Sequence, residues 1–589
     1  MTKSRFERMR ELCIFGFFPL VVCVLVVTIC GEAQPNDNLT KFPTHRWTCT
    51  ENKCVKLTNP TNSSCGTTLD TCNMLCGENP PLWPQTKYIE LKKKNSTTFL
   101  KQHILLKIHS PDAVKSELEE ASNRFLHTLV GDTREYQLYE DEDQIIKLNI
   151  HVKEADLKLA TTTNESYSLY SQKLPDFILV NMFAENYYGA RHGLETLSQL
   201  IWYDTISGRF RIVHDVKIVD QPSFTHRGLM LDVSRHYFPI ELLKKALDGM
   251  AASKLNVFHL HISDSTSFPL VLPNNKELAF DGAYDEDSKY TSADIEDLVE
   301  YARKRGIRTI MEVDAPSHIT SEAWDKSQVL CDNPDLFRST LNPDNPETLN
   351  TLQGIYSDLF ALGADRETFH IGDDEVVVDC WKGTNSAKGA DMNIYAVWAK
   401  FTNDMMNRVK LANNGTIPKN IVLWSSPLTD RYLKYLSYQN DLVVQYWFGE
   451  FKPILENGYK IIFSTVGRWY LDCGFGPWKK NDQNGACDPY TDWKNFYQYR
   501  PWKDYSNRIN QVLGGEVCLW TEQVSTDDME TRLWPRAAAF AERVWSDPLI
   551  FHQNDAFSRI DFHSRRLKNR GFRVAAIWPQ ICSLYPDKC

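Results

Sequence analysis

The sequence has no excess of positive charge, and this excludes one class of partner. Its 589 residues carry a formal net charge of −10, with 66 Lys and Arg against 76 Asp and Glu. No basic stripe stands out along the chain, whereas a surface that binds nucleic acid needs clustered lysines and arginines. We therefore expect no nucleic-acid partner.

Metal-binding and repeat signatures are also absent from the sequence. No Cys-x-x-Cys pair accompanies a histidine cluster, as a zinc site would require. No repeat of 20–50 residues and no low-complexity tract is visible. Twelve of the 15 cysteines lie after the first 33 residues. Because this number is even, we interpret them as disulfide staples rather than metal ligands. The disulfide candidates are Cys49, Cys54, Cys72, Cys76, Cys331, Cys380, the local pair Cys473 and Cys487, and the local pair Cys582 and Cys589; the pairing of Cys65 and Cys518 is left open.

Only one long apolar run is present, at residues 12–30, after a basic start. Residues 1–33 are therefore predicted to be a secretory signal peptide, with Gly31-Glu32-Ala33 as its cleavage site. The run is also close to the lower length limit of a membrane span, so an uncleaved signal-anchor is the alternative. Both place the rest of the chain in the secretory pathway, where it would be secreted, lysosomal, or anchored to a membrane with its remaining residues on the lumenal or extracellular side. Five glycosylation sequons agree with this: Asn38, Asn62, Asn95, Asn164 and Asn414.

Three segments are expected after the leader. Residues 34–80 form a Cys-rich lead-in, residues 81–220 a smaller α/β domain without a catalytic cluster, and residues 221–589 a larger domain. The larger domain alternates strand-like and helical patterns, which predicts a (β/α)₈ TIM barrel. The expected strands are 227–233, 256–262, 307–313, 367–373, 420–425, 442–448, 460–466 and 512–519, and the clearest helices are 240–254, 291–306, 394–411 and 528–546.

Each expected barrel strand ends in aromatic or ionisable residues, and this carries the functional prediction. Active residues of such barrels lie at the carboxyl ends of the strands. The ends carry Asp232 to Arg235, Ser263-Asp264, Asp314 to His318, Asp374-Glu375, Trp424, Trp447, Tyr470 with Asp472, and Trp520 with Glu522. A scaffold alone needs no such residues, so we expect a pocket at this end.

Asp374 and Glu375 are the predicted catalytic pair. Neighbouring carboxylates raise the pKa of one member, as a general acid near neutral pH requires. A solvated acidic loop is the structural alternative, and a divalent-cation site with His370 is another. The spacing is not that of a calcium loop, and His370 is better interpreted as a core histidine that holds a neighbouring loop.

Three tryptophans at strand ends predict an aromatic box for a sugar ring, since flat apolar sugar faces stack on aromatic rings. They are Trp424, Trp447 and Trp520, although each alone is more typical of a core residue. Arg235 and Glu522 would hydrogen-bond the hydroxyls. A buried arginine–carboxylate pair is the structural alternative for these two.

The motifs at the strand ends resemble the β-N-acetylhexosaminidases of glycoside hydrolase family 20. The resemblance covers about residues 45–589, and the N-terminal cysteine spacing is most similar to insect members. The motifs are His-x-Gly-x-Asp-Glu at 370–375, Leu-Asp-Val-Ser-Arg-His at 231–236, and the stretches 259–265, 314–318 and 514–522.

The resemblance implies release of terminal, non-reducing β-linked N-acetylglucosamine or N-acetylgalactosamine by a retaining, substrate-assisted mechanism. It assigns Glu375 as general acid and base and Asp374 as the group that orients and stabilises the acetamido group. Tyr470 would bind the acetamido oxygen, and Asp264 and His318 would support Glu375. Trp424, Trp447 and Trp520 would wall the pocket, and Arg235 and Glu522 would bind hydroxyls. No metal or organic cofactor is implied, and a homodimer is expected by analogy.

Three positions refine the implied activity. An acidic Asp472 predicts neutral rather than sulfated or otherwise anionic sugars. Trp478 is a candidate platform for an outer sugar. The segment from Trp478 to Cys487 lacks the second tryptophan of insect chitin-degrading members. That weakens the case for a chitin specialist and leaves glycan trimming or general glycoconjugate turnover open.

Asp373 departs from the family pattern, which has glycine there. An added negative charge could raise the pKa of Glu375, and the side chain could distort the strand end. If the strand stays regular, Asp373 points toward the helix layer and does little harm. A catalytically weakened, lectin-like surface protein that binds terminal N-acetylhexosamines is therefore the alternative to an active glycosidase.

Overall fold

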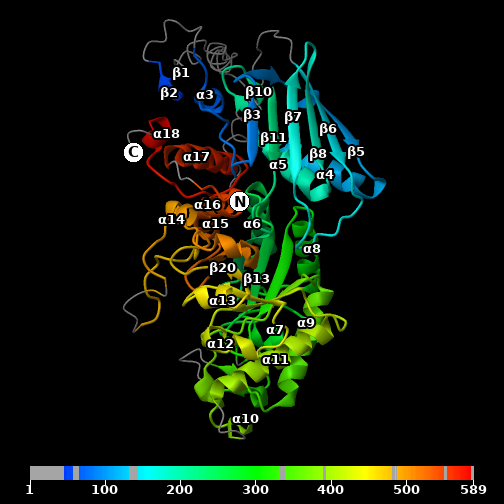
Figure 1. The fold of residues 1–589 in the computed structure, drawn as a ribbon, viewed down its shortest axis with the longest axis vertical. Helices are drawn as coiled ribbons and strands as arrows, with labels where there is room; N and C mark the ends of the chain where they lie inside the picture. Colours follow the sequence, from blue (N-terminus) through cyan, green and yellow to red (C-terminus); the bar gives the residue numbers. More distant parts are fainter. Residues whose placement is uncertain are drawn as a thin grey trace, which may run out of the picture.

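The protein is built of two stacked bodies with a small Cys-rich segment at one end (Figure 1). The computed structural model describes residues 45–57, 66–131, 144–320, 322–331, 339–388, 393–480, 485, 487–549 and 553–585. The predicted leader, Asn38, Asn62, Cys65 and Cys589 lie outside these ranges. Among the residues so described, no helix combines the length and the apolar character needed to cross a membrane.

The larger body is a barrel of eight parallel strands. They are β12 (His226–Asp232), β13 (Val257–Ser263), β14 (Arg308–Val313), β17 (Thr368–His370), β18 (Asn420–Trp424), β19 (Leu442–Tyr446), β20 (Lys460–Phe463) and β21 (Val512–Leu519). Neighbouring strands are hydrogen-bonded in the order β14-β13-β12-β21-β20-β19-β18-β17. The Asp373 N–H donates to Ala315 O at 3.0 Å and joins the two end strands. The predicted barrel and all eight strands are thus confirmed.

Helices cover the outside of the barrel, as amphipathic stretches between buried parallel strands must. The longer ones are α6 (Ile240–Ala252), α8 (Ser292–Arg303), α9 (Pro346–Ala361), α11 (Ile394–Ala412), α16 (Arg536–Ser546) and α17 (Gln553–Asn569); shorter ones are α7 (Glu277–Gly282), α10 (Asn385–Lys388), α12 (Pro427–Arg431), α13 (Lys452–Glu456), α14 (Trp493–Gln498), α15 (Met529–Leu533) and α18 (Gln580–Leu584). The helix expected over 528–546 is wrong as one element. It divides into α15 and α16 at Pro535, which has no backbone N–H to continue a helix.

The smaller body is a six-stranded sheet in the order β3-β11-β7-β8-β6-β5, with helices α4 and α5 and a second sheet β4-β10-β9. The elements are β3 (Tyr88–Leu91), β4 (Ser96–Phe99), β5 (Ile104–His109), α4 (Asp112–Thr128), β6 (Ile145–Val152), β7 (Tyr167–Lys173), β8 (Phe177–Ala184), α5 (Tyr187–Gln199), β9 (Ile201–Asp204), β10 (Arg209–Val213) and β11 (Val216–Asp220). Trp545 of α16 and Phe562 of α17 join its hydrophobic core, so the barrel end and this domain are packed together.

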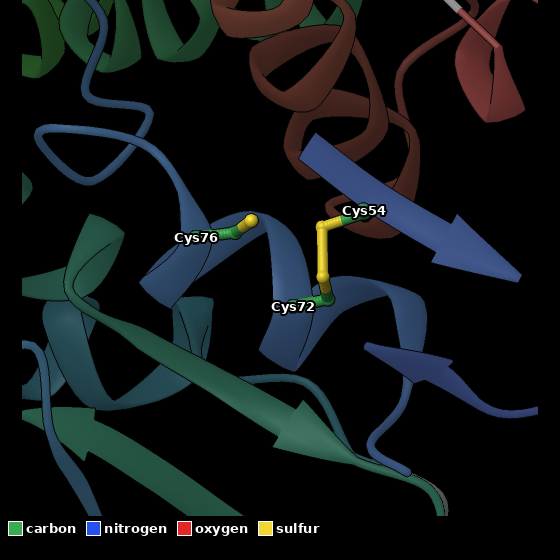
Figure 2. Close-up of side chains that lie close together, drawn as sticks. All are labelled: Cys54, Cys72 and Cys76. Atoms are coloured by element: carbon green, nitrogen blue, oxygen red, sulfur yellow. A yellow bond between two sulfur atoms is a disulfide. The ribbon is translucent and has the colours of Figure 1, made fainter. Parts of the chain in front are cut away.

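Disulfides hold the Cys-rich segment, which contains β1 (Trp47–Thr50), β2 (Lys53–Lys56) and α3 (Leu69–Cys76). Figure 2 shows Cys54 bonded to Cys72 beside Cys76, which is itself bonded to Cys49. Bonds Cys331–Cys380 and Cys473–Cys487 follow in the barrel, Cys582 is disulfide-bonded, and Cys518 is a buried free thiol. The interpretation as staples is confirmed for the nine bonded cysteines and is wrong for Cys518. The three sequon asparagines within the described residues, Asn95, Asn164 and Asn414, are exposed.

Candidate active site

A cavity of about 840 Å³ opens at the carboxyl end of the barrel strands. Of the predicted site residues, Arg235, Asp264, His318, Glu375, Trp447 and Glu522 line it, together with the candidate platform Trp478. The strands end around one opening, so residues up to 287 positions apart meet there. The other predicted residues are not among those that line the cavity: Asp374, Trp424, Tyr470, Asp472 and Trp520.

Glu375 reaches the cavity from the loop after β17 and is held from one side. Its side chain is 58% exposed, and its Oε2 lies 3.2 Å from His318 Nε2. His318 Nδ1 lies 3.2 Å from Asp264 Oδ1, and Asp264 is buried. The structure therefore brings together the three residues predicted to act in a line. The hydrogen bond from His318 lowers the pKa of Glu375, an effect that burial only partly opposes.

Asp374 is the member of the pair whose pKa is raised. Burial is the main cause and the charge of Glu375 adds to it, so its pKa is about 6 although His318 opposes the shift. The side chain is 13% exposed, and its Oδ1 is buried without a hydrogen-bond partner. One raised pKa was expected for the pair, but on the general acid. The structure places it on Asp374, because His318 contacts Glu375 more closely.

A cluster of aromatic side chains adjoins the cavity. Trp424 and Tyr470 are buried in one cluster with Cys518, and Trp447 and Trp520 pack against that cluster. The Trp424 and Trp520 rings lie 5.8 Å apart, and the Tyr470 and Trp520 rings 6.2 Å apart. The predicted tryptophans and Tyr470 are thus brought together. Trp447 both lines the cavity and packs against this cluster, so the cluster adjoins the cavity lining.

Arg235 is fixed by two carboxylates rather than one. It lies 3.2 Å from Asp232 and 2.7 Å from Asp264, with its guanidinium 5.1 Å from the Trp520 ring centre. Burial lowers its pKa, but Asp264, Asp232 and Glu522 raise it more, so it stays charged. Arg235 therefore forms the buried arginine–carboxylate contacts that were considered as its structural role, and its side chain also lines the cavity.

Asp472 and Glu522 border a small hollow beside the main cavity. Burial, and then the charge of Glu522, raises the pKa of Asp472 to about 8. Its Oδ1 is buried without a hydrogen-bond partner. Below pH 8 Asp472 is therefore mainly a neutral acid that can donate a hydrogen bond. The charge repulsion expected against anionic sugars develops only above that pH.

The bend that carries the catalytic pair depends on Gly372. Its φ is +74°, and a Cβ there would stand 1.8 Å from Asp314 Oδ1. Strand β17 therefore ends at His370, three residues earlier than expected. His370 Nδ1 lies 3.0 Å from the Gly372 N–H that donates to it. This agrees with the interpretation of His370 as a core histidine that holds the adjacent loop.

Asp373 points away from the cavity although its backbone is not a regular strand, since its φ is +73°. Its carboxyl is buried against α11, where it accepts from Trp398 Nε1 at 2.8 Å and from Thr402 Oγ1 at 2.9 Å. Burial raises its pKa well above the usual range, and these two hydrogen bonds offset only part of that. Because the carboxyl faces α11 and is hydrogen-bonded there, it does not place a third charge in the cavity beside Glu375.

We expect Asp373→Gly to weaken folding without raising activity. The glycine removes the strain of a positive φ, worth about 1 kcal/mol. It also leaves Trp398 Nε1 and Thr402 Oγ1 without a buried acceptor, at about 1–3 kcal/mol. Urea unfolding is expected to show a net loss, with kcat within about threefold of wild type. Asp373→Asn, which keeps a carbonyl toward Trp398, is the matched control. A tenfold gain of kcat in the glycine variant would contradict this.

The main site residues that the sequence did not single out are Glu312 and its β13 neighbours His259 and His261. Glu312 is fully buried on β14, 2.5 Å from His261 and 2.9 Å from His370. A glutamate inside an apolar strand, Ile310-Met-Glu-Val313, was the available signal. A buried carboxylate needs charged or hydrogen-bonding partners, and the histidines of β13 are those partners.

Several groups of possible metal ligands occur among the described residues. The barrel groups are His259, Glu312 and His370; His261, Asp264 and Asp314; and Asp314, His318 and Asp374. Most of these atoms are hydrogen-bonded or ion-paired to one another. The thiol group of Cys54, Cys72 and Cys76 is consumed by disulfides. The residues therefore have protein partners that account for their positions.

Comparison with known proteins agrees with this geometry. Residues 224–548 match the description "Glycosyl hydrolase family 20, catalytic domain", and residues 82–200 match "beta-acetyl hexosaminidase like". The probable beta-hexosaminidase fdl of Drosophila melanogaster is 34% identical over 610 residues, covering 92% of this chain and 91% of that protein.

Two further relatives extend the comparison. The chitooligosaccharidolytic beta-N-acetylglucosaminidase of Ostrinia furnacalis is 34% identical over 568 residues, covering 91% of this chain and 94% of that protein. The crystal structure of a chitobiase of Flavobacterium johnsoniae superposes with a TM-score of 0.66 at 25% identity, covering 83% of this chain and 73% of that one. The chain therefore belongs to glycosyl hydrolase family 20, and it is a β-hexosaminidase of that family.

Proposed function

We propose that the enzyme removes terminal, non-reducing β-linked N-acetylglucosamine or N-acetylgalactosamine by a retaining, substrate-assisted mechanism. The main observation in support is that Asp374 Oδ1 is buried without a hydrogen-bond partner beside the exposed carboxylate of Glu375. In that mechanism the 2-acetamido oxygen attacks the anomeric carbon, and the acetamido N–H becomes acidic and positively charged. An ionised Asp374 with a free acceptor atom suits that N–H.

Glu375 is proposed to protonate the leaving oxygen and then to activate water. The His318–Glu375 pair holds one proton that either side chain can carry, since their atoms are 3.2 Å apart. Glu375 can thus act as the acid while His318 is neutral. After the leaving group departs, the ionised Glu375 takes a proton from the attacking water. Neither step uses a metal or an organic cofactor.

The remaining predicted contacts are proposed to hold a single terminal sugar. The cavity lies at one end of the barrel and adjoins the aromatic cluster, which suits a terminal sugar and supports exo action. Arg235 and Glu522 would bind hydroxyls, Tyr470 the acetamido oxygen, and Trp447 and Trp520 the ring faces. Trp478, 45% exposed at the cavity, would stack on the next sugar.

The alternative, a weakened lectin-like binder, loses its main support in this geometry, because the Asp373 carboxyl faces α11 rather than the cavity. Disulfides and exposed sequons support a secretory location. The homodimer, and cleavage or retention of the leader, stay predictions.

The test of the proposed mechanism is hydrolysis of a chromogenic N-acetyl-β-glucosaminide followed by NMR of the first-formed anomer. Retention is expected, together with competitive inhibition by a thiazoline analogue of the bicyclic intermediate. Inversion, or no inhibition by the thiazoline, would overturn the substrate-assisted route. Binding of N-acetylglucosamine without any turnover would favour the lectin alternative.

A further inference from the structure

The line of ionisable groups at the site continues below the cavity into the barrel interior. Asp264 Oδ2 lies 2.9 Å from His261 Nε2, and His261 Nδ1 lies 2.5 Å from Glu312 Oε2. The same Glu312 oxygen lies 3.1 Å from His259 Nε2, whose ring continues to Glu516 Oε1 at 2.8 Å through Nδ1. All five side chains are buried. Carboxylates and imidazoles therefore alternate from the cavity deep into the barrel.

The geometry fixes the charge of His261. Both of its nitrogens face carboxylate oxygens, and an ionised carboxylate accepts hydrogen bonds but donates none. His261 satisfies both only as an imidazolium. Burial lowers its pKa, but Glu312 and Asp264 raise it well above the usual range. Burial in turn raises the pKa of Glu312, yet the surrounding histidines hold it well below its usual range. The two charges stabilise each other where water cannot.

Glu312 is the point at which three parts of the site meet. Its Oε2 holds His261, and thereby the line to Asp264. Its Oε1 accepts from Trp424 Nε1 at 2.8 Å and lies 2.9 Å from His370 Nδ1. The same His370 nitrogen accepts from Gly372, at the bend that leads to the catalytic pair. One carboxylate thus contacts the aromatic cluster through Trp424, the bend through His370, and the support of the general acid through His261.

We propose that Glu312 is a positioning residue for the hydrolysis, and that it acts on Glu375 through His261, Asp264 and His318 without touching the sugar. This inference rests on the proposed function, because it concerns the same acid. Glu375 is more than half exposed and His318 is its only close ion-pair partner among the described residues. The placing of Glu375 therefore depends on how firmly His318 is held.

A glutamine at 312 would remove the charge and keep the size. It can still accept from Trp424, but it no longer stabilises an imidazolium at 261. A neutral His261 can accept from the new amide N–H through Nδ1, but its hydrogen bond to Asp264 is then no longer charge-assisted and is weaker. Asp264 then holds His318 less firmly, and Glu375 loses its fixed orientation. The expected defect is in protonating the leaving group, not in binding the sugar.

The test compares two substrates of full-length Glu312→Gln by kcat/KM, which reports the first chemical step. One is chitobiose, whose sugar alcohol must be protonated to leave. The other is the 2,4-dinitrophenyl N-acetyl-β-glucosaminide, whose leaving group needs no acid. General acid catalysis contributes about 10²–10⁴-fold. We expect a loss of about 10²-fold with chitobiose and less than tenfold with the dinitrophenyl glycoside, with KM for each within about threefold.

Glu165→Gln is the matched control. Glu165 is equally buried and is paired with His192 at 2.8 Å and with Arg227, outside the line to Glu375. It is expected to lose thermal stability while retaining both activities. If Glu312→Gln does not accumulate as folded protein, the same two substrates are compared with His261→Gln, because that variant changes the contact between residue 261 and Asp264.

The ratio of the two losses decides the outcome. A loss at least tenfold greater with chitobiose supports the inference. A smaller ratio, or losses equal to those of Glu165→Gln, assigns Glu312 a structural role and overturns it. Wild-type enzyme that hydrolyses neither substrate would instead overturn the proposed function, and this inference with it.

Discussion

Glu375→Gln is expected to abolish hydrolysis of natural β-linked substrates while leaving sugar binding intact. Glutamine has the same shape but no transferable proton, so a sugar alcohol cannot leave, and the attacking water has no base. We expect kcat/KM for chitobiose to fall by about 10³-fold or more, within the range of general acid–base contributions. The Kd for N-acetylglucosamine, measured by calorimetry, is expected to stay within about threefold of wild type.

The control for this variant is Glu450→Gln. Glu450 is an exposed glutamate on the loop after β19, at the same end of the barrel but outside the cavity lining. It is expected to retain wild-type activity. If Glu375→Gln kept a tenth or more of the wild-type kcat/KM with chitobiose, another group would have to supply the proton. If it lost sugar binding as well, Glu375 would be a binding residue rather than the acid.

The parts of the site that the sequence predicts are those fixed by strand order. The carboxyl ends of parallel strands meet at one edge whatever the side chains are. For this reason Arg235, Asp264, His318, Glu375 and the aromatic residues could be assigned together before any contact was known. The family motifs then distinguished the acid from its neighbour, which spacing alone could not do.

The parts that the sequence did not predict depend on contacts between side chains distant in the chain. The direction of Asp373 is set by Trp398 and Thr402, which lie on α11. The lowered pKa of Glu375 depends on the atom of His318 that faces it. Glu312 looks like one polar residue in an apolar strand until the histidines are placed around it. In each case a three-dimensional contact, not the residue type, decides the charge.

Asp374→Asn is expected to lower activity by about 10²–10³-fold, the usual cost of removing one preorganised electrostatic group. Only the ionised carboxylate stabilises positive charge on the acetamido group. The pKa of Asp374 is about 6 in the free enzyme, raised mainly by burial. The wild-type kcat/KM for a chromogenic substrate is therefore expected to fall as the pH drops below about 6. The residual activity of Asp374→Asn is expected to lack that acid limb.

The same substitution is expected to stabilise the fold at neutral pH, which separates loss of function from misfolding. The pKa of Asp374 in the folded state lies above the value of about 3.9 for an unfolded chain. The folded protein therefore binds this proton more tightly, and its stability falls as the pH rises from about 4 to 6. Above pH 6 the buried charge costs about 1–3 kcal/mol. Asparagine removes that cost, so Tm at pH 7 rises by a few degrees while Tm at pH 4 is unchanged.

Asp547→Asn is expected to change Tm at pH 7 in the opposite direction, and it serves as the control. Burial would raise the pKa of Asp547, but Arg500, 2.7 Å away, and Arg543 hold it below the usual range. Its charge stabilises the fold above the unfolded pKa, and that contribution is lost as the pH falls. Asp547→Asn is therefore expected to lower Tm at pH 7 and to leave hydrolysis unchanged. If Asp374→Asn lowered Tm at pH 7 in the same way, its inactivity would reflect a damaged barrel rather than a missing charge.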